Sequence, residues 1–306
     1  NMGYTGSERF APGNRFGFFP SGAVGWVMSQ EKFMEPLKPW LSKLKFRFSM
    51  GLVGNDYANN RWLYISEYSK DGSGHIVEDK SANLSAQWEQ AFKKDLGIEM
   101  GFFGNDLTLN IDLFDEYRDK MLISDDNNTP IWLGTSSKGA IKKHGIEVEA
   151  NYSHRFGRDW TFSVGGNFSY SDNRVVYADD APFSLEHQRA AGAPIGTPTG
   201  GLYLADSGFL TSVDDIHSSF LPVTMDKVII GDYKFIDYTA DGVIDSDDKG
   251  RIRGSVYPPV SFAFNTGFSW KGLEFRMLLH GYAGKWVNYN QIYEYEFFKG
   301  NYSIHK

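Results

Sequence analysis

The 306-residue sequence predicts an all-β protein, an antiparallel β-barrel whose strands cross a membrane. Three observations support this fold class. Long segments alternate apolar and polar residues, tight turns join these segments in pairs, and aromatic residues are abundant, with 24 Phe, 17 Tyr and 8 Trp. Successive side chains of a strand point to opposite faces, so alternation gives each segment one apolar and one polar face. No apolar run is long enough for a transmembrane helix.

The clearest pair of strands lies between Gly145 and Asp172. The first arm sets Ile146, Val148, Ala150 and Tyr152 against Glu147, Glu149, Asn151 and Ser153. The second arm sets Trp160, Phe162, Val164, Phe168 and Tyr170 against Thr161, Ser163, Asn167 and Ser169. Each arm has about ten or more residues, which exceeds the roughly five to six of soluble strands and matches the ~9–11 that cross hydrocarbon.

Six further segments show the same alternation and bring the predicted number of strands to about eight. They are 15–27, 43–53, 96–103, 107–114, 260–270 and 273–282. Gly104 to Asp106 and the pair Lys271, Gly272 supply the positive φ that tight hairpins need. The segment 31–44, which contains Pro36 and Pro39, predicts a short helical or irregular connector. The residues before the first of these strands predict a loop, and eight strands can close a barrel by themselves.

The connections between these strands are unequal. Those on one side are short, whereas the other side has connections of about 40 residues after Val53, about 25 after Asp115 and about 90 before Val260, so that residues 173–258 form a long extracellular loop region. Outer-membrane barrels have short periplasmic turns, long extracellular loops and aromatic girdles. Beside the short turns lie Trp26, Trp40, Trp160 and Trp270. A soluble β-sandwich shares the alternation but seldom has such long strands and unequal loops.

Several functional classes find no support in the sequence. The formal net charge of −7 and the lack of a long basic run disfavour nucleic acid as a partner. The 7 His residues are scattered, and there is no nucleophile elbow or Gly-rich phosphate loop, so we expect that the protein is not an enzyme. Glu147 and Glu149 are better explained as the polar lining of a wet interior than as an acid/base pair.

An acidic segment between Asp237 and Asp248, DYTADGVIDSDD, has the spacing of an EF-hand-type calcium loop. The candidate calcium ligands are Asp237, Thr239, Asp241, Val243 through its carbonyl, Asp245 and Asp248. Gly242 takes the position of the sharp turn. Thr239 replaces the usual Asp or Asn, and Asp248 replaces the bidentate Glu, so the alternative is an ordered acidic turn without metal.

An aromatic run follows the last clear strand and therefore lies on the extracellular side. Its members are Trp286, Tyr289, Tyr293, Tyr295, Phe297, Phe298 and Tyr302. We expect Trp286, Tyr289 and Tyr293 to bind substrate, because aromatic faces stack on sugar rings or on peptide side chains. The alternative is that these residues belong to the girdle or contact a partner protein.

Five segments carry a resemblance to a known family over nearly the whole chain. They read GSERFAPGNRFGFFPSGAVGWVMSQEKFM, WLSKLKFRFSMGLVGND, NLSAQWEQAFKKDLGIEMGFFGNDLTLNIDLFDEYRDKMLI, GAPIGTPTGGLY and GDYKFIDYTADGVIDSDDKGRI. In this order they resemble the barrel of SusC/RagA-like TonB-dependent outer-membrane transporters of Bacteroidetes. The resemblance implies import of oligosaccharides or peptides across the Gram-negative outer membrane, with a SusD-like lipoprotein at the extracellular mouth and the TonB complex as the energy source.

The resemblance also implies that the chain is an arc of a larger barrel rather than a closed one. The sequence holds no plug domain, no TonB box and no terminal strand ending in an aromatic residue, so we expect the natural protein to be longer. Residues facing the lumen would then be Asn110, Glu147, Glu149, Asn151, Asn167, Arg276 and His280. The alternative function is a soluble or surface-anchored calcium-dependent glycan-binding β-protein, and the sequence does not identify the substrate.

Overall fold

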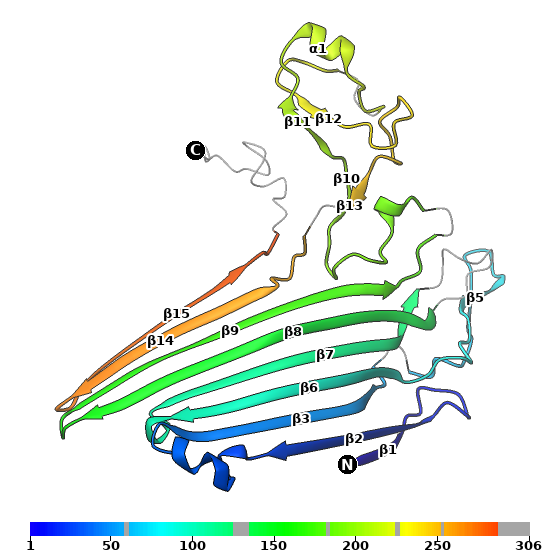
Figure 1. The fold of residues 1–306 in the computed structure, drawn as a ribbon. Coiled ribbons are helices and arrows are strands. Elements are labelled where there is room, and N and C mark those ends of the chain that lie inside the picture. The colour runs from blue at the N-terminus through cyan, green and yellow to red at the C-terminus, as the bar shows by residue number, and fades with distance from the viewer. Residues whose placement is uncertain (58–60, 125–134, 182–183, 224–226, 252–253, 287–306) are drawn as a thin grey trace.

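The computed structural model describes residues 1–57, 61–124, 135–181, 184–223, 227–251 and 254–286. In this part of the chain, one antiparallel sheet of nine strands dominates the fold (Figure 1). In sheet order the strands are β1 (Met2–Gly6), β2 (Phe16–Trp26), β3 (Leu41–Asn55), β6 (Glu89–Phe102), β7 (Leu107–Ser124), β8 (Thr135–Phe156), β9 (Trp160–Tyr177), β14 (Val260–Trp270) and β15 (Leu273–Ala283). Each strand pairs with the next along this order, and β1 and β15 are the two edges. The sheet is therefore an open arc, as expected from the resemblance.

The structure adds one strand to the eight that the sequence predicts. Residues Met2–Gly6, predicted as loop, form β1 and pair with Phe16–Pro20 of β2. Tyr4 stacks on Phe16 with ring centroids 5.2 Å apart. The prediction of a loop was wrong because five residues that include two glycines are too few to show alternation. Pairing with β2, rather than local sequence, makes this segment a strand.

Three central strands are longer than predicted. β7, β8 and β9 contain 18, 22 and 18 residues. Much of the predicted 25-residue connection after Asp115 is therefore strand, with only residues 125–134, outside the described range, lying between β7 and β8. Charged residues on both faces hide the alternation in these upper parts. β7 also contains a bulge between Arg118 and Met121, where Lys120 has a φ of 57°.

The short turns gather at one end of the sheet. The β14–β15 turn uses Lys271 (φ 45°) and Gly272 (φ 92°), and the β6–β7 turn uses Gly104 (φ 73°) and Asn105 (φ 74°), which confirms the predicted positive φ at these four residues. Asp106, the third residue of the predicted β6–β7 turn, instead has a φ of −59°. The short 3-10 helix Lys32–Leu37 lies in the connector predicted at 31–44, and a second one, Met28–Gln30, precedes it. The last four residues of the predicted connector are strand instead, because β3 begins at Leu41. Trp160 and Trp270 stack at this end with ring centroids 5.3 Å apart.

The long connections gather at the other end of the sheet. One of them contains the hairpin of β4 (Glu67–Lys70) and β5 (Ile76–Lys80). The longest, residues 178–259, forms a lobe beyond the ends of the strands (Figure 1), which we call the loop lobe. It contains a 3-10 helix Glu186–Gln188, β10 (Thr199–Gly201), β11 (Leu204–Phe209), α1 (Val213–Ser218), β12 (Tyr233–Phe235) and β13 (Gly250–Arg251). Residues 173–177, predicted as loop, still belong to β9.

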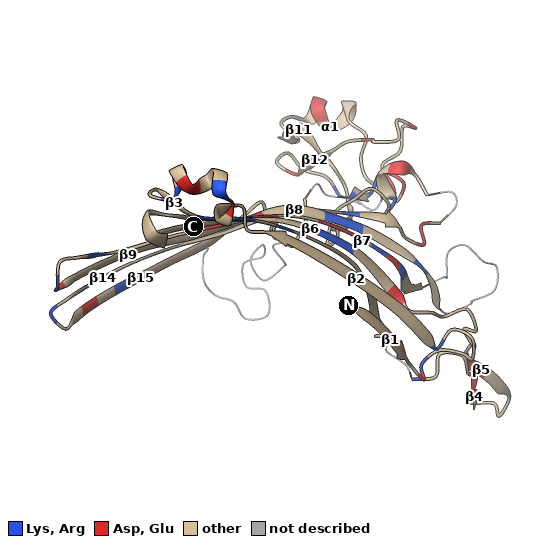
Figure 2. Ribbon diagram, turned by 60° about the horizontal axis from the view of Figure 1, so that its bottom comes forward, with Lys and Arg blue, Asp and Glu red and all other residues tan. Residues whose placement is uncertain are grey.

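The apolar core is small for a chain of this size. A cluster of Phe10, Leu63, Ala86 and Trp88 packs under the loops beside β2. The loop lobe has its own buried residues, Leu210 and Ile244. In the part of the chain that the structure describes, no other layer covers the nine-stranded sheet, which forms a single curved layer (Figure 2). Among the described residues, no helix is long and apolar enough to span a membrane.

Candidate functional site

The two faces of the sheet differ in chemistry over the ten residue steps from Trp160 to Tyr170 on β9. On one face, cross-strand neighbours form apolar rows, one of which contains Phe46, Ile98, Ile111, Val148, Phe168 and Phe262. These rows extend from Trp160 to Tyr170 on β9, and we call them the apolar band. Ten residue steps at ~3.3 Å, tilted by about 40°, give a height of about 25 Å, the thickness of the apolar band of an outer-membrane barrel.

The opposite, polar face carries the residues that the sequence assigned to the lumen. One row contains Lys45, Glu99, Asn110, Glu149 and Asn167, and the next contains Arg47, Gly97, Asp112, Glu147 and Ser169. The strand register sets these neighbours, because a shift of one residue would exchange the two faces. A hollow of about 900 Å³ lies over this part of the sheet.

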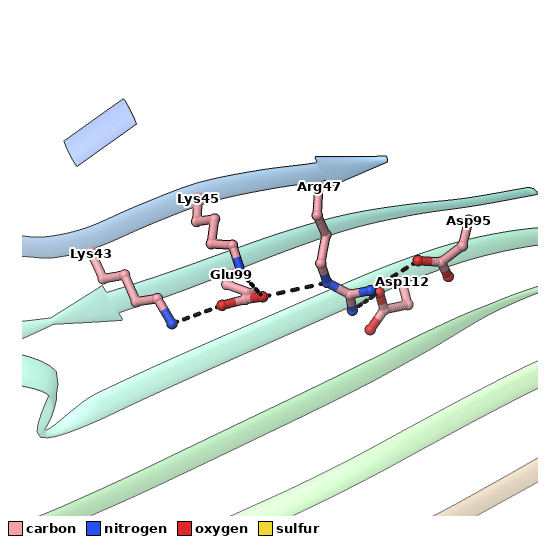
Figure 3. Close-up of polar contacts among 6 residues, drawn as sticks. All are labelled: Lys43, Lys45, Arg47, Asp95, Glu99 and Asp112. Carbon is pink, nitrogen blue, oxygen red and sulfur yellow. Dashed lines mark hydrogen bonds and ion pairs between the residues drawn. The ribbon is translucent and has the colours of Figure 1, made fainter. Parts of the chain in front are cut away.

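A network of ion pairs joins β3, β6 and β7 on the polar face (Figure 3). Glu99 lies at its centre and accepts from Lys43 Nζ at 2.7 Å and from Lys45 Nζ at 3.0 Å. Arg47 Nε lies 3.4 Å from the same carboxylate, and Arg47 Nη1 donates to Asp95 at 2.9 Å. Arg47 Nη2 reaches Asp112 on β7. The three cations of β3 are therefore all engaged by carboxylates.

Arg47 reaches across a whole strand because of Gly97. Asp112 is two strands away from Arg47, and Gly97 of β6 lies between them in the register. A Cβ at position 97 would overlap the Arg47 side chain. The absence of a side chain at this one position thus lets the guanidinium lie over the β6 backbone and contact carboxylates on both neighbouring strands.

The β8 side of the polar face is acidic and rich in amides. Asn151 Nδ2 donates to Glu149 Oε1 at 2.7 Å, and Ser169 Oγ lies 3.5 Å from Glu147 Oε1. Within the described residues, no Lys or Arg nitrogen is paired with Glu147 or Glu149. Hydrogen-bonding groups, rather than fixed ion pairs, therefore line this part of the hollow.

Arg276 and His280, also predicted to face the lumen, lie on the polar face of β15. Arg276 pairs with Glu274 at 2.6 Å and lines a second depression of about 560 Å³. His280 is opposite Ala263 and contacts the ring of Tyr282 edge-on at 6.4 Å. The structure does not bring these two residues next to Glu147 and Glu149, because β9 and β14 lie between them.

The candidate calcium loop is an ordered turn around a buried carboxylate. Asp248 is fully buried, and its Oδ1 accepts from the backbone N–H of Tyr238 at 2.7 Å and of Thr239 at 3.0 Å. Its Oδ2 accepts from Asp245 N–H at 2.8 Å. Asp237 Oδ2 accepts from Gly242 N–H at 2.7 Å. Burial alone would raise the pKa of Asp248, but these backbone donors outweigh it and lower that pKa below its ordinary value.

The remaining candidate ligands make similar local contacts. Asp241 accepts from Val243 N–H, and Asp245 accepts from Asp247 N–H, at 2.9 and 2.8 Å. Among the described residues, no group of three or more His, Cys, Asp or Glu side chains is placed to hold a metal ion. Calcium binding by this loop stays a prediction.

Only Trp286 of the three predicted substrate-binding aromatics is described. Its backbone N–H donates to Ser255 O at 2.9 Å, and its indole lies against Gly254, where a Cβ would overlap the ring. Gly254 has a φ of 107°, which favours glycine for a second reason. The indole is 48% exposed at the loop end of the sheet. Tyr289 and Tyr293 lie outside the described residues.

Sequence reasoning missed the ion-pair network. Lys45 and Arg47 alternate visibly with Phe46 and Phe48, but their partners are 48 to 65 residues away in the sequence. Alternation places a residue on a face and gives no cross-strand register. Clusters of alternating cations on one strand and carboxylates on the next are the only signal that the sequence offers.

The sheet thus has an apolar band on one face, a polar opposite face and its long loops at one end. Comparison with known proteins shows which family has this combination. Residues 3–303 match the family described as TonB dependent receptor-like, beta-barrel. The chain belongs to this family, whose members are outer-membrane transporters of Gram-negative bacteria and not enzymes. This confirms the predicted fold class and location, and it excludes the soluble alternative.

Among individual relatives, the chain is similar to TonB-dependent receptor P3 of Formosa agariphila (25% identity) and to TonB-dependent receptor SusC of Bacteroides thetaiotaomicron (24% identity). Each alignment covers 94% of this chain and 30% of the relative. A solved structure of the RagAB peptide transporter matches in fold with a TM-score of 0.71, at 20% identity, over 94% of this chain and 32% of that one. The barrel is thus of the SusC/RagA kind, and the chain spans about a third of the length of these relatives.

Proposed function

We propose that this chain forms part of the lumen wall of an active importer for oligosaccharides or peptides. In this proposal the whole protein works with a SusD-like surface lipoprotein and takes its energy from the TonB complex. The observation that carries the proposal is the pairing of an apolar band of membrane height with a polar face over a hollow, in a chain matched to the transporter family from end to end. The RagAB peptide transporter among the solved structures supports peptides as one class of cargo, and the family resemblance supplies oligosaccharides as the other.

The polar face suits the passage of a hydrated cargo. The carboxylates of Glu147 and Glu149 and the amides of Asn110, Asn151 and Asn167 offer acceptors and donors to hydroxyl groups or to peptide units. The Lys43–Arg47 cations are already paired with carboxylates, so they stiffen the sheet rather than attract anions. At the extracellular end, we propose that the exposed face of Trp286 stacks on a sugar ring or an apolar side chain of the cargo.

Uptake by cells that carry the full-length protein tests this function. Labelled oligosaccharide and peptide pools are offered to cells with and without the gene, and accumulation is measured before and after dissipation of the proton gradient. Gene-dependent and energy-dependent uptake of either pool supports the proposal. Recovery of the protein outside the outer membrane contradicts the proposal, and so does uptake that is the same with and without the gene.

The partner and the contribution of Trp286 need separate measurements. Purification of the tagged full-length protein from native membranes is expected to bring down a surface lipoprotein, and purification without one contradicts that part of the proposal. Trp286→Ala is expected to weaken cargo binding by about 5- to 100-fold, the value of one stacking contact. Trp26→Ala, at the opposite end of the sheet, is the matched control.

The calcium prediction has its own readout. Hydrogen exchange of residues 237–248 in the full-length protein is compared in calcium and in chelator. Added protection in calcium supports a bound ion, and identical exchange in both conditions supports the ordered acidic turn.

A further inference from the structure

The outward face of the sheet changes character just past the apolar band. The last apolar row contains Leu96, Leu113, Ile146 and Tyr170. The next row toward the loops contains Lys94, Asp115, His144 and Asp172, and the one after it contains Phe92, Tyr117, Lys142 and Arg174. Lys94, Lys142 and Arg174 thus stand within two rows of the band on three strands, and we call them the outward cation belt.

Side-chain contacts confirm that these cations lie on the outward face. Lys94 Nζ is 5.3 Å from the ring centroid of Phe92, its outward neighbour on β6. Lys142 Nζ is 3.8 Å from Asp115, an outward residue of β7. The residues next to them in sequence point the other way, since Lys93 pairs with Glu116 at 3.2 Å and Lys143 lies over Phe114 at 5.3 Å.

The cations of the belt are only partly neutralised. Within the described residues, Lys94 has no carboxylate partner, and Lys142 reaches Asp115 only at 3.8 Å. Arg174 donates through Nε to Asp172 at 3.2 Å and through Nη1 to Gly192 O at 3.4 Å. All three side chains are exposed. In contrast, each cation on the polar face of β3 contacts a carboxylate.

The position of the belt defines what it meets in the membrane. The belt lies on the loop side of a band about 25 Å high, so it is level with the headgroups of the outer leaflet. Cations at that depth attract anionic headgroups, and Lys or Arg donors match phosphate oxygens. We propose that Lys94, Lys142 and Arg174 bind a phosphate-bearing headgroup of an outer-leaflet lipid, against the outside of the barrel.

The test uses the full-length protein in detergent and lipopolysaccharide as the lipid probe, with and without its lipid A phosphates. The triple variant Lys94→Gln, Lys142→Gln, Arg174→Gln is compared with the unchanged protein by native mass spectrometry and by titration. We expect binding of the phosphorylated lipid to weaken roughly 100-fold, because three cations that each contribute about a factor of five together contribute a factor of about 125. Dephosphorylated lipid is expected to bind both proteins equally weakly.

The matched control is Lys93→Gln with Lys143→Gln, which removes two cations from the same strands at the same height but on the polar face. This variant is expected to bind the phosphorylated lipid as the unchanged protein does. Equal losses in both variants would show that net charge, not the belt, governs binding. Undiminished binding in the triple variant would overturn the proposal, and so would an unchanged protein that binds dephosphorylated lipid as tightly as the phosphorylated lipid. Heat-modifiable migration on gels verifies that each variant is folded.

Discussion

At the scale of single residues, a few positions control how the two faces are built. Gly97 allows Arg47 to lie across β6 and to contact Asp95, Glu99 and Asp112 together. Asp248 organises the acidic turn of the loop lobe through N–H groups of Tyr238, Thr239 and Asp245. In both cases one residue lets polar groups from segments that are apart in the sequence form ion pairs or hydrogen bonds.

Gly97→Ala is expected to destabilise the sheet by about 1–3 kcal/mol, the usual cost of inserting a methyl group into an occupied space. The Cβ overlaps Arg47, which must leave its carboxylates or displace the β6 backbone. Urea unfolding of the full-length protein in lipid vesicles measures this change. Gly22→Ala is the control, because a Cβ there meets nothing within 4 Å. Equal stability of both variants would contradict the assigned place of Arg47.

Asp248→Asn is expected to loosen residues 237–248 by about 1–3 kcal/mol, since an amide NH₂ would face a backbone N–H that now donates to a carboxylate oxygen. Hydrogen-exchange protection of this turn reports the loss. Asp247→Asn, at an exposed neighbouring position, serves as the comparison and is expected to leave protection unchanged. Unaltered protection in Asp248→Asn would show that the turn does not depend on this carboxylate.

At the scale of elements, turns and ion pairs fix the geometry between strands. Positive φ at Lys271 and Gly272 closes the β14–β15 hairpin, and its register continues unbroken from Trp270↔Leu273 to Val260↔Ala283. In the loop lobe, α1 is tied to β12 by Lys234 Nζ, which lies 2.5 Å from Asp215 Oδ1. Short elements that could not persist alone are thus held by contacts between them.

The Asp215 contact predicts an acid dependence of the loop lobe. Its ion pair with Lys234, followed by the N–H of Thr211, lowers the pKa of Asp215 from 3.8 to about 2. A lowered pKa in the folded state stabilises the lobe above pH 3.8, and this contribution is lost as the pH falls from 3.8 toward 2. Exchange protection of residues 211–235, corrected for intrinsic rates, is expected to fall over that range.

Asp215→Asn is expected to remove that pH dependence and to show the lower protection at neutral pH as well. Asp214→Asn, on the same helix, retains the Asp215–Lys234 pair and is expected to behave as the unchanged protein. A lobe with the same acid dependence in both variants would assign the effect to other groups.

At the scale of the whole molecule, the sheet is a boundary between two solvents. The apolar band faces hydrocarbon and the polar face faces water, so most large apolar side chains are exposed in the isolated chain. This explains why the buried core is small although the aromatic content is high. Stability of the sheet depends on the membrane on one side and on cross-strand contacts within it.

Phe168→Arg is expected to cost about 2–4 kcal/mol of folding free energy in lipid, because position 168 lies within the apolar band. Asn167→Arg, one residue earlier on the polar face, is expected to be nearly neutral. The folded fraction of the full-length protein is measured across a urea series in vesicles. Similar costs at both positions would mean that the faces have been assigned wrongly.

Particular residues show how far prediction from the sequence extends. The hairpin of Glu147, Glu149 and Asn167 was assigned to the right strands and to one face, because alternation is a local property. β1 and the upper part of β7 were missed, because they are strands only through pairing with their neighbours. The same limit hid the contact of Arg47 with Asp112, which depends on the register of three strands and on Gly97 between them.

The sequence by itself determined most of the strands, the chemistry of each face, the unequal lengths of the connections at the two ends of the sheet and the family resemblance. All of these depend on the order of residues along the chain. Only the tertiary structure decided which charges meet, where the hollow lies, and that Lys94, Lys142 and Arg174 stand together outside the apolar band. The physical reason is that period and turn propensity act over a few residues. Register, which joins residues tens of positions apart, is set by the pairing of whole strands.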